Sequence, residues 1–491
     1  MKKIKKLAVA NRGEVAVRII QACHELNIKT VLLHSEVDVG TVAYRLSDET
    51  FCIGRAPTAE SYLNIAANVQ GAKSAGVDAV HPGFGFLSEN ADFADACVKA
   101  GLIFVGPSAE SIRLLGDKIS AKKIISEAGV PFVPGYMGEN QEVEHLIAEA
   151  KKIGFPVIVK AAAGGGGRGM KVLKNEADAA ELIPSAKREA LSAFGSEIVF
   201  LEKYLDHAKH IEFQIFGDYK GKCVHLFERE CTVQRRHQKI IEEAQSVLLS
   251  ESLRSQMSKA AVALAEKAKY QGAGTVEFLV QDEKFYFLEM NTRLQVEHPV
   301  TELLLGIDLV KAQILNAAED FVLWKQSDLV PRGHAIEARI YAENPFENGI
   351  PSTGKLGQQY FAAAPGRRFE IGFEAGDTIT PFYDSMIAKV IVWDESRPRA
   401  IQKLLRTLEE SFVFGVHVNF EYLKAILTHP EFLSGQMTTQ FISKYFPDGL
   451  APRELSPDER AFADLSLKAL GSQHRGPQNT TNPWNINWRS V

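Results

Sequence analysis

The chain has 491 residues, of which 24% are charged, and its formal net charge is −5. This length allows several hydrophobic cores, and the near balance of acids and bases excludes the strongly basic surface of a nucleic-acid-binding protein. No apolar run approaches the roughly 20 residues of a membrane span, and the five cysteines are dispersed without a Cys-x-x-Cys pair. We therefore expect a multidomain, cytoplasmic α/β protein with reduced thiols and no membrane or nucleic-acid partner.

Residues 1–116 alternate short apolar runs with helical periodicity, which predicts a parallel, doubly wound sheet. A helix is expected from Glu14 to Leu26, and strands are expected at residues 7–10, 30–34, 78–81 and 102–105. The turn after the first strand reads Asn-Arg-Gly-Glu, so the Gly-x-Gly-x-x-Gly dinucleotide fingerprint is missing. This domain is therefore expected to be Rossmann-like but without a dinucleotide site.

Composition and turn residues divide the remaining chain into three parts. A second domain is expected at 117–330 and contains a smaller lobe at about 131–204. A third domain, richer in strands, is expected at 331–446, followed by a tail at 447–491. Within the tail, Ser456 is placed to cap one short helix that ends near Gly471, and the polar residues beyond it predict disorder.

The most flexible motif is a run of four consecutive glycines between two apolar segments, Val157–Lys160 and Met170–Leu173. Glycine lets backbone N–H groups approach phosphate oxygens without obstruction by a Cβ atom. No Gly-Lys-Ser/Thr ends the run and no helix follows it, so it is not a Walker A loop. A flap that closes over a nucleotide, with Lys160 as counter-charge, is one interpretation; a flexible surface hairpin is the other.

The segment 289–297 combines carboxylate, amide and guanidinium groups at alternate positions. In an extended chain, one face would carry all five of these side chains, namely Glu289, Asn291, Arg293, Gln295 and Glu297. A solvated strand face is also polar at every second residue. The mixture of groups favours a site that binds magnesium, an anion and a proton-accepting group.

Just upstream, residues 275–280 and 285–289 are typical of the two arms of a hairpin. A three-residue turn at Asp282–Lys284 would set Glu277 opposite Glu289, whereas a two-residue turn would put them on opposite faces. Under the three-residue register the two carboxylates flank a common point, and magnesium held by one or two carboxylates plus nucleotide phosphates is the arrangement expected there.

Two further groups of polar residues indicate a function only if they lie close to that acidic segment. The basic loop Gln234–Lys239 would by itself be a solvated loop, but Lys239 near the acids could bind a small anion. Arg339 lies on an alternating strand and is unremarkable alone, and a structural role is favoured for His81, His210 and His298.

Taken together, these motifs resemble those of biotin carboxylases, the ATP-grasp subunits or domains of acetyl-CoA, propionyl-CoA, methylcrotonoyl-CoA and pyruvate carboxylases. The likeness runs from Ile4 to Tyr445 and rests on the glycine run and on four segments: Ala10–Glu14, His81–Asn90, Gln234–Lys239 and Glu289–Val300. It implies an α/β fold with a Rossmann-like N-terminal domain, an ATP-grasp central domain with a mobile lid, and an α+β C-terminal domain.

The resemblance also implies ATP-dependent carboxylation of biotin by bicarbonate through carboxyphosphate, with Mg²⁺ or Mn²⁺ as cofactor. The implied metal ligands are Glu277, Glu289 and Asn291. The implied nucleotide-binding residues are Lys118, Lys160, Gly164, Gly165, Gly166, Gly167, Gly169, Glu202, Lys203, Leu205, His210, Gln234, His237 and Leu279. Bicarbonate would be held by Lys239, Arg293, Gln295 and the Val296 backbone, with Glu297 as its base and Arg339 stabilising the biotin enolate.

The partners follow from the same resemblance. This chain carries no Ala-Met-Lys-Met biotinylation motif, so biotin is expected on a separate biotin carboxyl carrier protein, with carboxyltransferase subunits and a homodimer as further partners. Such a subunit would catalyse the first half-reaction of an acetyl-CoA or other acyl-CoA carboxylase, as in fatty acid biosynthesis. Two alternatives stay open: another ATP-grasp enzyme, such as a purine-pathway carboxylase or a carbamoyl-phosphate-forming enzyme, and a nucleotide-binding scaffold without catalysis.

Overall fold

The computed structural model describes residues 3–116, 124–126, 129–162, 170–451, 457, 458, 460, 461 and 465. The chain divides into two compact units, Met1–Gly449 and Leu450–Val491. In the second unit, the described residues from 457 onward are helical, where the sequence predicted a short helix. The predicted end of that helix and the predicted disorder beyond it lie outside the described residues. Among the described helices, none has the length and apolar character needed to cross a membrane.

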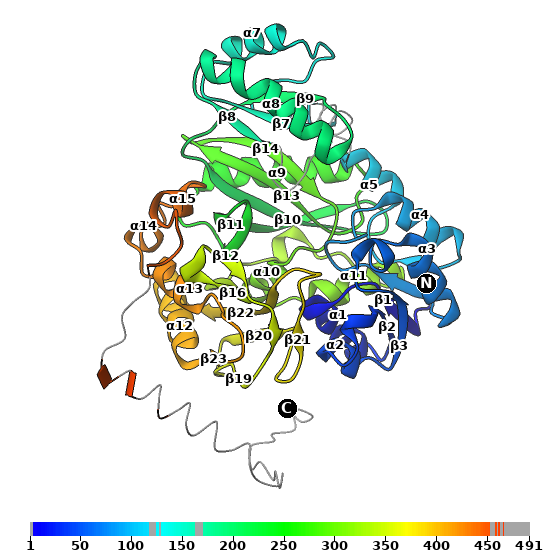
Figure 1. Ribbon diagram of the computed structural model, residues 1–491. Helices are drawn as coiled ribbons and strands as arrows, with labels where there is room; N and C mark the ends of the chain where they lie inside the picture. Colours follow the sequence, from blue (N-terminus) through cyan, green and yellow to red (C-terminus); the bar gives the residue numbers. More distant parts are fainter. Residues whose placement is uncertain are drawn as a thin grey trace. The chain divides into compact units, whose positions relative to one another are not determined.

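The N-terminal part of the first unit is a five-stranded parallel sheet in the order β3-β2-β1-β4-β5 (Figure 1). Its strands are β1 (Lys6–Val9), β2 (Lys29–Ser35), β3 (Glu49–Gly54), β4 (Ala79–His81) and β5 (Ile103–Phe104). The connecting helices are α1 (Gly13–Glu25), η1 (Glu36–Asp38), α2 (Val42–Leu46), η2 (Thr58–Glu60), α3 (Ile65–Ser74), α4 (Ala91–Lys99) and α5 (Ala109–Gly116). The predicted Rossmann-like sheet is confirmed; β3 was not predicted, because its apolar run is only three residues long and half of its residues are exposed.

Both faces of this sheet are buried, as the helical crossovers of a parallel sheet require. Alternate residues of β1 belong to different cores: Leu7 and Val9 pack with α1 residues such as Ile19, whereas Ala8 packs with Phe93 of α4. Continuous burial explains why these strands read as unbroken apolar runs.

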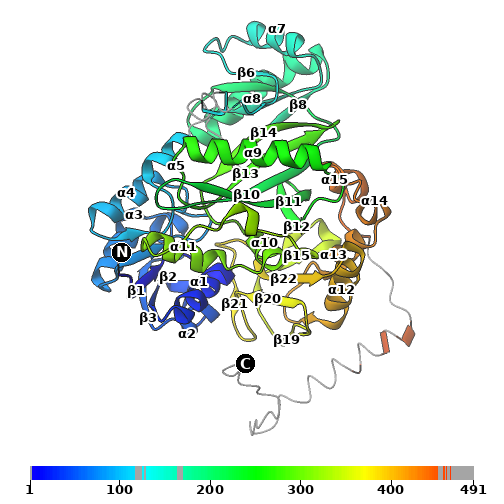
Figure 2. The same cartoon turned by 180° about the vertical axis from the view of Figure 1, so that it is seen from behind.

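The centre of the unit is an eight-stranded antiparallel sheet in the order β14-β13-β10-β11-β12-β15-β22-β20 (Figures 1 and 2). Its strands are β10 (Lys209–Gly217), β11 (Cys223–Arg235), β12 (Gln238–Ala244), β13 (Gly272–Gln281), β14 (Lys284–Asn291), β15 (His334–Tyr341), β20 (Arg367–Ile371) and β22 (Met386–Asp394). Three helices belong to the same part of the chain: α9 (Glu251–Lys267), α10 (His298–Leu305) and α11 (Leu309–Ala317). Because β12 pairs with β15, strands from the predicted second and third domains form one continuous sheet.

The smaller lobe is a four-stranded antiparallel sheet in the order β6-β9-β7-β8 with its own apolar core. Its elements are β6 (Gly135–Tyr136), α7 (Val143–Ile153), β7 (Val157–Ala161), β8 (Lys171–Leu173), α8 (Glu176–Phe194) and β9 (Val199–Lys203). The lobe adjoins β14 through a bridge between Phe132 and Phe287. The two strands that flank the glycine run pair as a hairpin, as predicted, whereas residues 163–169 lie outside the described part of the chain.

The C-terminal part completes the unit with helices, the longest of which packs on β22, and with three short two-stranded ladders. The helices are η3 (Gln326–Asp328), η4 (Pro345–Glu347), α12 (Arg397–Glu410), α13 (Phe420–Leu427), α14 (Pro430–Leu433) and α15 (Phe441–Tyr445). The ladders pair β16 (Glu343–Asn344) with β17 (Ile350–Pro351), β18 (Gly354–Lys355) with β21 (Thr378–Ile379), and β19 (Gln359–Tyr360) with β23 (Phe412–Val413). Helix α12 buries one face at helical spacing, through Ala400, Ile401, Leu404 and Leu408.

Candidate active site

One face of the eight-stranded sheet carries a row of charged residues from four neighbouring strands. Strand β10 alternates buried polar residues, His210, Glu212 and Gln214, with apolar residues that enter the core. Glu212 lies directly across from Arg229 on β11 and from Glu277 on β13. Glu277 in turn lies across from Glu289 on β14. Cross-strand neighbours are close enough to interact, so the pairing alone assembles this row.

The β13–β14 hairpin brings Glu277 opposite Glu289, but not through the three-residue turn that the predicted register required for this pairing. Gln281 pairs with Lys284, so the turn contains two residues, Asp282 and Glu283, both with positive φ. Such turns match the right-handed twist of the strands. A β-bulge between Glu277 and Phe278 then shifts the register by one residue and returns both acids to the same face.

Lys239 is the centre of the charged cluster. Its ammonium donates hydrogen bonds to Glu212 Oε2 (2.5 Å), Glu277 Oε1 (2.8 Å) and Glu297 Oε1 (2.7 Å). Burial by itself would lower the pKa of Lys239, but these three carboxylates outweigh it and raise the pKa well above its usual value. The lysine is therefore charged at neutral pH and holds three acids together.

Glu297 is buried between two cations at the N-terminal end of α10. Its second oxygen accepts a hydrogen bond from Arg339 Nη2 at 3.0 Å. Burial would raise the pKa of Glu297, but Lys239, Arg339 and Arg229 overcome that effect and hold the pKa well below its usual range. Glu297 is therefore a carboxylate at neutral pH, the protonation state that a general base requires, and its cationic neighbours lower its basicity.

The other polar residues of segment 289–297 converge on Glu277, although not by strand alternation. β14 ends at Asn291, and residues 292–297 are neither strand nor helix, so the expected extended face is wrong beyond Asn291. Asn291 Nδ2 and Gln295 Nε2 instead donate to the same oxygen of Glu277, at 2.7 and 2.8 Å. Arg293 Nη2 donates to Asn291 Oδ1 at 3.0 Å. Hydrogen bonds to shared partners, rather than the pleat, bring these side chains together.

Several residues of the cluster were missed or given no role by the sequence reasoning. Arg229 is fully buried and bonds Glu212 and Gln295, among others. Glu242 accepts from Arg339 Nε at 2.6 Å, and burial raises its pKa to about 7. Glu89 of the N-terminal part accepts from Arg293 Nε at 2.9 Å. Alternation along residues 209–217 could have indicated Glu212, whereas the other three are recruited by long-range contacts.

The residues implied in nucleotide binding lie in two places. In the lobe, Lys160 pairs with Glu202 across β7 and β9 at 2.5 Å. The ammonium of Lys203 donates to the carbonyls of Gly154 and Phe155, so it stabilises the fold of the lobe. Leu205 follows β9 and is partly buried. Lys118, Gly164, Gly165, Gly166, Gly167 and Gly169 lie outside the described residues.

The remaining implied nucleotide residues lie on the eight-stranded sheet. Gln234 contacts His210 Nδ1 at 2.6 Å, and Leu279 is the cross-strand partner of His210. His210 also pairs with Glu277 Oε2 at 2.8 Å, so it joins the charged row. His237 occupies the β11–β12 turn, and its pKa is lowered by burial and by the charge of Lys160, which links the turn to the lobe.

The two other histidines have structural contacts, in keeping with the favoured interpretation. His81 accepts a hydrogen bond from the Gly83 backbone N–H at 3.0 Å, and His298 Nδ1 contacts the Gln295 carbonyl at 2.8 Å. Burial lowers the pKa of His81 to about 3 and that of His298 well below its usual value. Both are therefore neutral at physiological pH.

The carboxylates of this cluster fit a divalent cation. Glu289 faces Glu277 and has no hydrogen-bond or ion-pair partner among the residues that the structure describes. Carboxylate and amide oxygens are the ligands that Mg²⁺ prefers, and Glu277, Glu289 and Asn291 supply them. Two other sets of potential ligands, His210–Glu212–Glu277 and Glu212–Cys231–Glu297, are also close together. All three sets include an acid that the Lys239 ammonium already bonds, and of the three only the set with Glu289 contains a carboxylate without a partner among the described residues.

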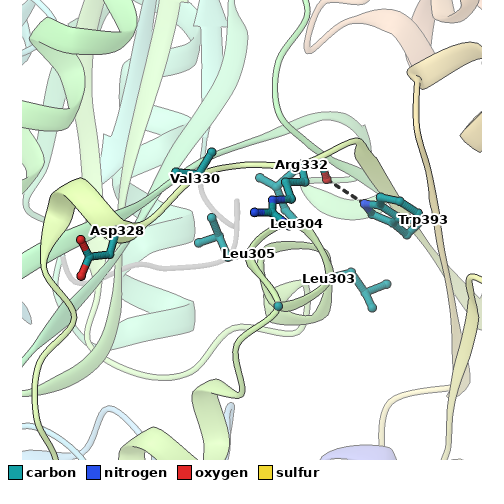
Figure 3. A pocket seen from close by; sticks show the side chains of 8 residues that line it. Leu303, Leu304, Leu305, Asp328, Val330, Arg332 and Trp393 are labelled. Carbon is teal, nitrogen blue, oxygen red and sulfur yellow. Dashed lines mark hydrogen bonds between the residues drawn. The ribbon is translucent and has the colours of Figure 1, made fainter.

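A separate cavity of about 390 Å³ lies at the opposite end of α10 from Glu297 (Figure 3). Leu303, Leu304, Leu305, Gly306, Asp328, Val330, Arg332 and Trp393 line it. None of the sequence-predicted site residues is among them, so the charged cluster is the better candidate for the active site.

Comparison with known proteins agrees with this geometry. Three family models match consecutive parts of the chain: the biotin carboxylase N-terminal domain at residues 3–112, the carbamoyl-phosphate synthase L chain ATP-binding domain at 117–321, and the biotin carboxylase C-terminal domain at 337–444. A biotin carboxylase of Halalkalibacterium halodurans is 47% identical over 445 residues, 90% of this chain and 98% of that protein.

Two further relatives extend the comparison. The mitochondrial methylcrotonoyl-CoA carboxylase subunit alpha of Dictyostelium discoideum is 45% identical over 489 residues, 99% of this chain and 70% of that protein. The biotin carboxylase domain dimer of Hydrogenobacter thermophilus 2-oxoglutarate carboxylase, solved with MgADP and bicarbonate, superposes with a TM-score of 0.86 at 41% identity. The match covers 91% of this chain and 98% of that domain. The chain therefore belongs to the biotin carboxylase family.

Proposed function

We propose that this chain is an ATP-dependent ligase that carboxylates biotin with bicarbonate. The observation that carries the proposal is the ionised Glu297 carboxylate, fixed between Lys239 and Arg339 and adjoining a cluster suited to magnesium. A base, two cations and a metal-binding pair of acids are the groups that activation of bicarbonate by ATP requires.

The chemistry follows from where these groups lie. Bicarbonate bound near Arg293, Gln295 and the Val296 backbone would give its proton to Glu297, and its oxygen would attack the γ-phosphorus of ATP. ADP leaves and carboxyphosphate forms, while Lys160 and Lys239 offset negative charge. A magnesium ion held by Glu277, Glu289 and Asn291 would supply further charge neutralisation at the phosphates.

The second step transfers the carboxyl group. Carboxyphosphate breaks down to CO₂ and phosphate, and the phosphate takes the proton from biotin N1′. The resulting enolate attacks CO₂, and Arg339 stabilises the enolate charge while Glu242 holds the guanidinium in place. Closure of the lobe at about residues 131–204 over the nucleotide would exclude water, which otherwise destroys carboxyphosphate.

Biotin is proposed to arrive on a separate carrier protein, with carboxyltransferase subunits completing the enzyme. An exposed aromatic cluster on β19, on β23 and at the residue after β23 supports a homodimer. The ring centroids of Tyr360 and Phe412 lie 6.0 Å apart, and those of Phe412 and Phe414 lie 5.0 Å apart. For the final acceptor we propose a methylcrotonoyl-CoA-type substrate. The Dictyostelium relative supports this choice, because its similarity covers 99% of the chain and includes the tail.

The decisive experiment is ADP release by the purified chain with MgATP and bicarbonate. We expect the rate to depend on bicarbonate and to rise with free biotin, but not with aminoimidazole ribonucleotide or ammonia. Stimulation by either of the latter would instead support a purine-pathway or carbamoyl-phosphate-forming enzyme. ATP binding without turnover would support a scaffold. Assays with acetyl-, propionyl- and methylcrotonoyl-CoA, after co-purification of the partner subunits, would identify the acceptor.

A further inference from the structure

A second row of charged residues crosses the other half of the eight-stranded sheet. Arg339 on β15 lies directly across from Lys389 on β22, and Lys389 lies across from Glu370 on β20. The side chain of Lys389 is 0% exposed, and that of Glu370 is also buried. A fully buried lysine is rare unless its charge is paired, so its partners indicate what it is for.

The row holds two adjacent residues of the proposed bicarbonate segment. Lys389 Nζ donates to the Val296 backbone carbonyl at 2.6 Å and pairs with Glu370 Oε2 at 2.7 Å. The neighbouring Arg339 donates to the Glu297 carboxylate at 3.0 Å. One strand therefore binds the backbone just before the proposed base, and the next strand binds the side chain of that base.

This anchoring matters because residues 292–297 lack a strand ladder or helix of their own. Position in such a segment depends on individual hydrogen bonds. Burial alone would lower the pKa of Lys389, but Glu337, Glu370 and Glu14 outweigh it and raise the pKa. The lysine is thus an ammonium, and hydrogen bonds from charged donors are the stronger kind.

We propose that Lys389 is a positioning residue for bicarbonate activation. By bonding the Val296 carbonyl, Lys389 fixes the Val296–Glu297 peptide. This in turn fixes the backbone of the proposed anion site and the Cα atom from which the Glu297 side chain extends. Catalytic groups need placement within fractions of an ångström, so loss of this bond would impair use of bicarbonate rather than of ATP. The inference rests on the proposed function.

The test compares two variants with the wild-type chain. Lys389→Met combined with Glu370→Gln removes the bond to Val296 together with the charge of the Glu370 ion-pair partner, whereas Glu370→Gln alone keeps the ammonium at Val296. We expect the double variant to raise the KM for bicarbonate by about tenfold or more, the effect of losing one charged hydrogen bond. The Kd for ATP should stay within about twofold, and Glu370→Gln should leave the bicarbonate KM within about threefold.

Two results would overturn the inference: a bicarbonate KM within about threefold of wild type in the folded double variant, or an equal rise in both variants. The second would assign the effect to the charge of Glu370. Circular dichroism establishes folding; if the double variant is unfolded, Lys389→Leu with Glu370→Gln, which also lacks a donor at Val296, is judged by the same limits. Absence of bicarbonate-dependent turnover in the wild-type chain would instead refute the proposed function.

Discussion

Replacing Glu297 with glutamine preserves the shape of this side chain but removes its ability to accept a proton. In the wild-type chain the carboxylate is bonded by Lys239 and Arg339 and is held ionised by them. General-base catalysis contributes about 10²- to 10⁴-fold to a rate, so we expect kcat for bicarbonate-dependent ADP release to fall by that range. The Kd for ATP should change by less than about twofold, because the phosphates would contact other residues.

The fold should survive this substitution. Without the Glu297 charge, Lys239 keeps Glu212 and Glu277, and Arg339 keeps Glu242, so neither cation is left unpaired. We expect a loss of roughly 1–3 kcal/mol in unfolding free energy, the scale for one partner removed from a buried polar contact that stays partly satisfied.

Glu302 provides a matched control, because it is a buried glutamate on α10, the helix whose N-cap is Glu297. It pairs with Arg18 and Arg368, away from the charged cluster. Glu302→Gln should therefore cost comparable stability but leave kcat within about threefold. Stopped-flow or coupled assays of ADP release, with calorimetry for ATP binding, measure both variants. A folded Glu297→Gln enzyme with wild-type kcat would refute the assignment of Glu297 as the base.

Three further outcomes are expected. Glu289→Gln should raise the Mg²⁺ concentration for half-maximal activity by about tenfold, which is typical of a weakened metal site. The control Glu283→Gln, in the nearby turn, should leave this concentration unchanged. The same Mg²⁺ dependence in both variants would contradict the metal site. The pKa of Glu243 is about 2, against 4.5 when unfolded, because its arginine and histidine partners outweigh burial. Its stabilisation is therefore complete above about pH 4.5 and is lost as pH falls toward 2. The stability difference between wild type and Glu243→Gln should shrink by roughly 3 kcal/mol over that window in denaturant titrations, and a constant difference would argue against the ion pairs. Tyr360→Ser with Phe412→Ser should convert the proposed dimer to monomer in sedimentation velocity, and an unchanged dimer would locate the interface elsewhere.

Much of the architecture could be predicted from sequence alone, because residues that are buried in strands and helices form recognisable apolar patterns along the chain. The apolar runs of the N-terminal sheet predicted β1, β2, β4 and β5, whose two faces are both covered. The paired strands around the glycine run were likewise predicted from composition. The family followed from motifs rather than from physics, and the comparisons show the same family.

Less of the candidate site than of the fold could be predicted from the sequence. Sequence reasoning grouped Glu277, Glu289 and Glu297, because it placed Glu289 and Glu297 on one face of an extended segment and Glu277 opposite Glu289 in a hairpin. It could not show that a two-residue turn needs a bulge to bring Glu277 opposite Glu289, since the register depends on twist and packing. Nor could it show that segment 292–297 leaves the strand and is held from outside.

The partners that hold the segment are remote in the chain. Glu89, Arg229 and Lys389 each reach it from a different element, by contacts with residues 60 or more positions away. Sequence alone determined which chemistry the chain carries, because alternation and motif spacing are local properties. The tertiary structure alone decided which charges meet, because the pairing of buried ions depends on the placement of separate strands and helices in one sheet.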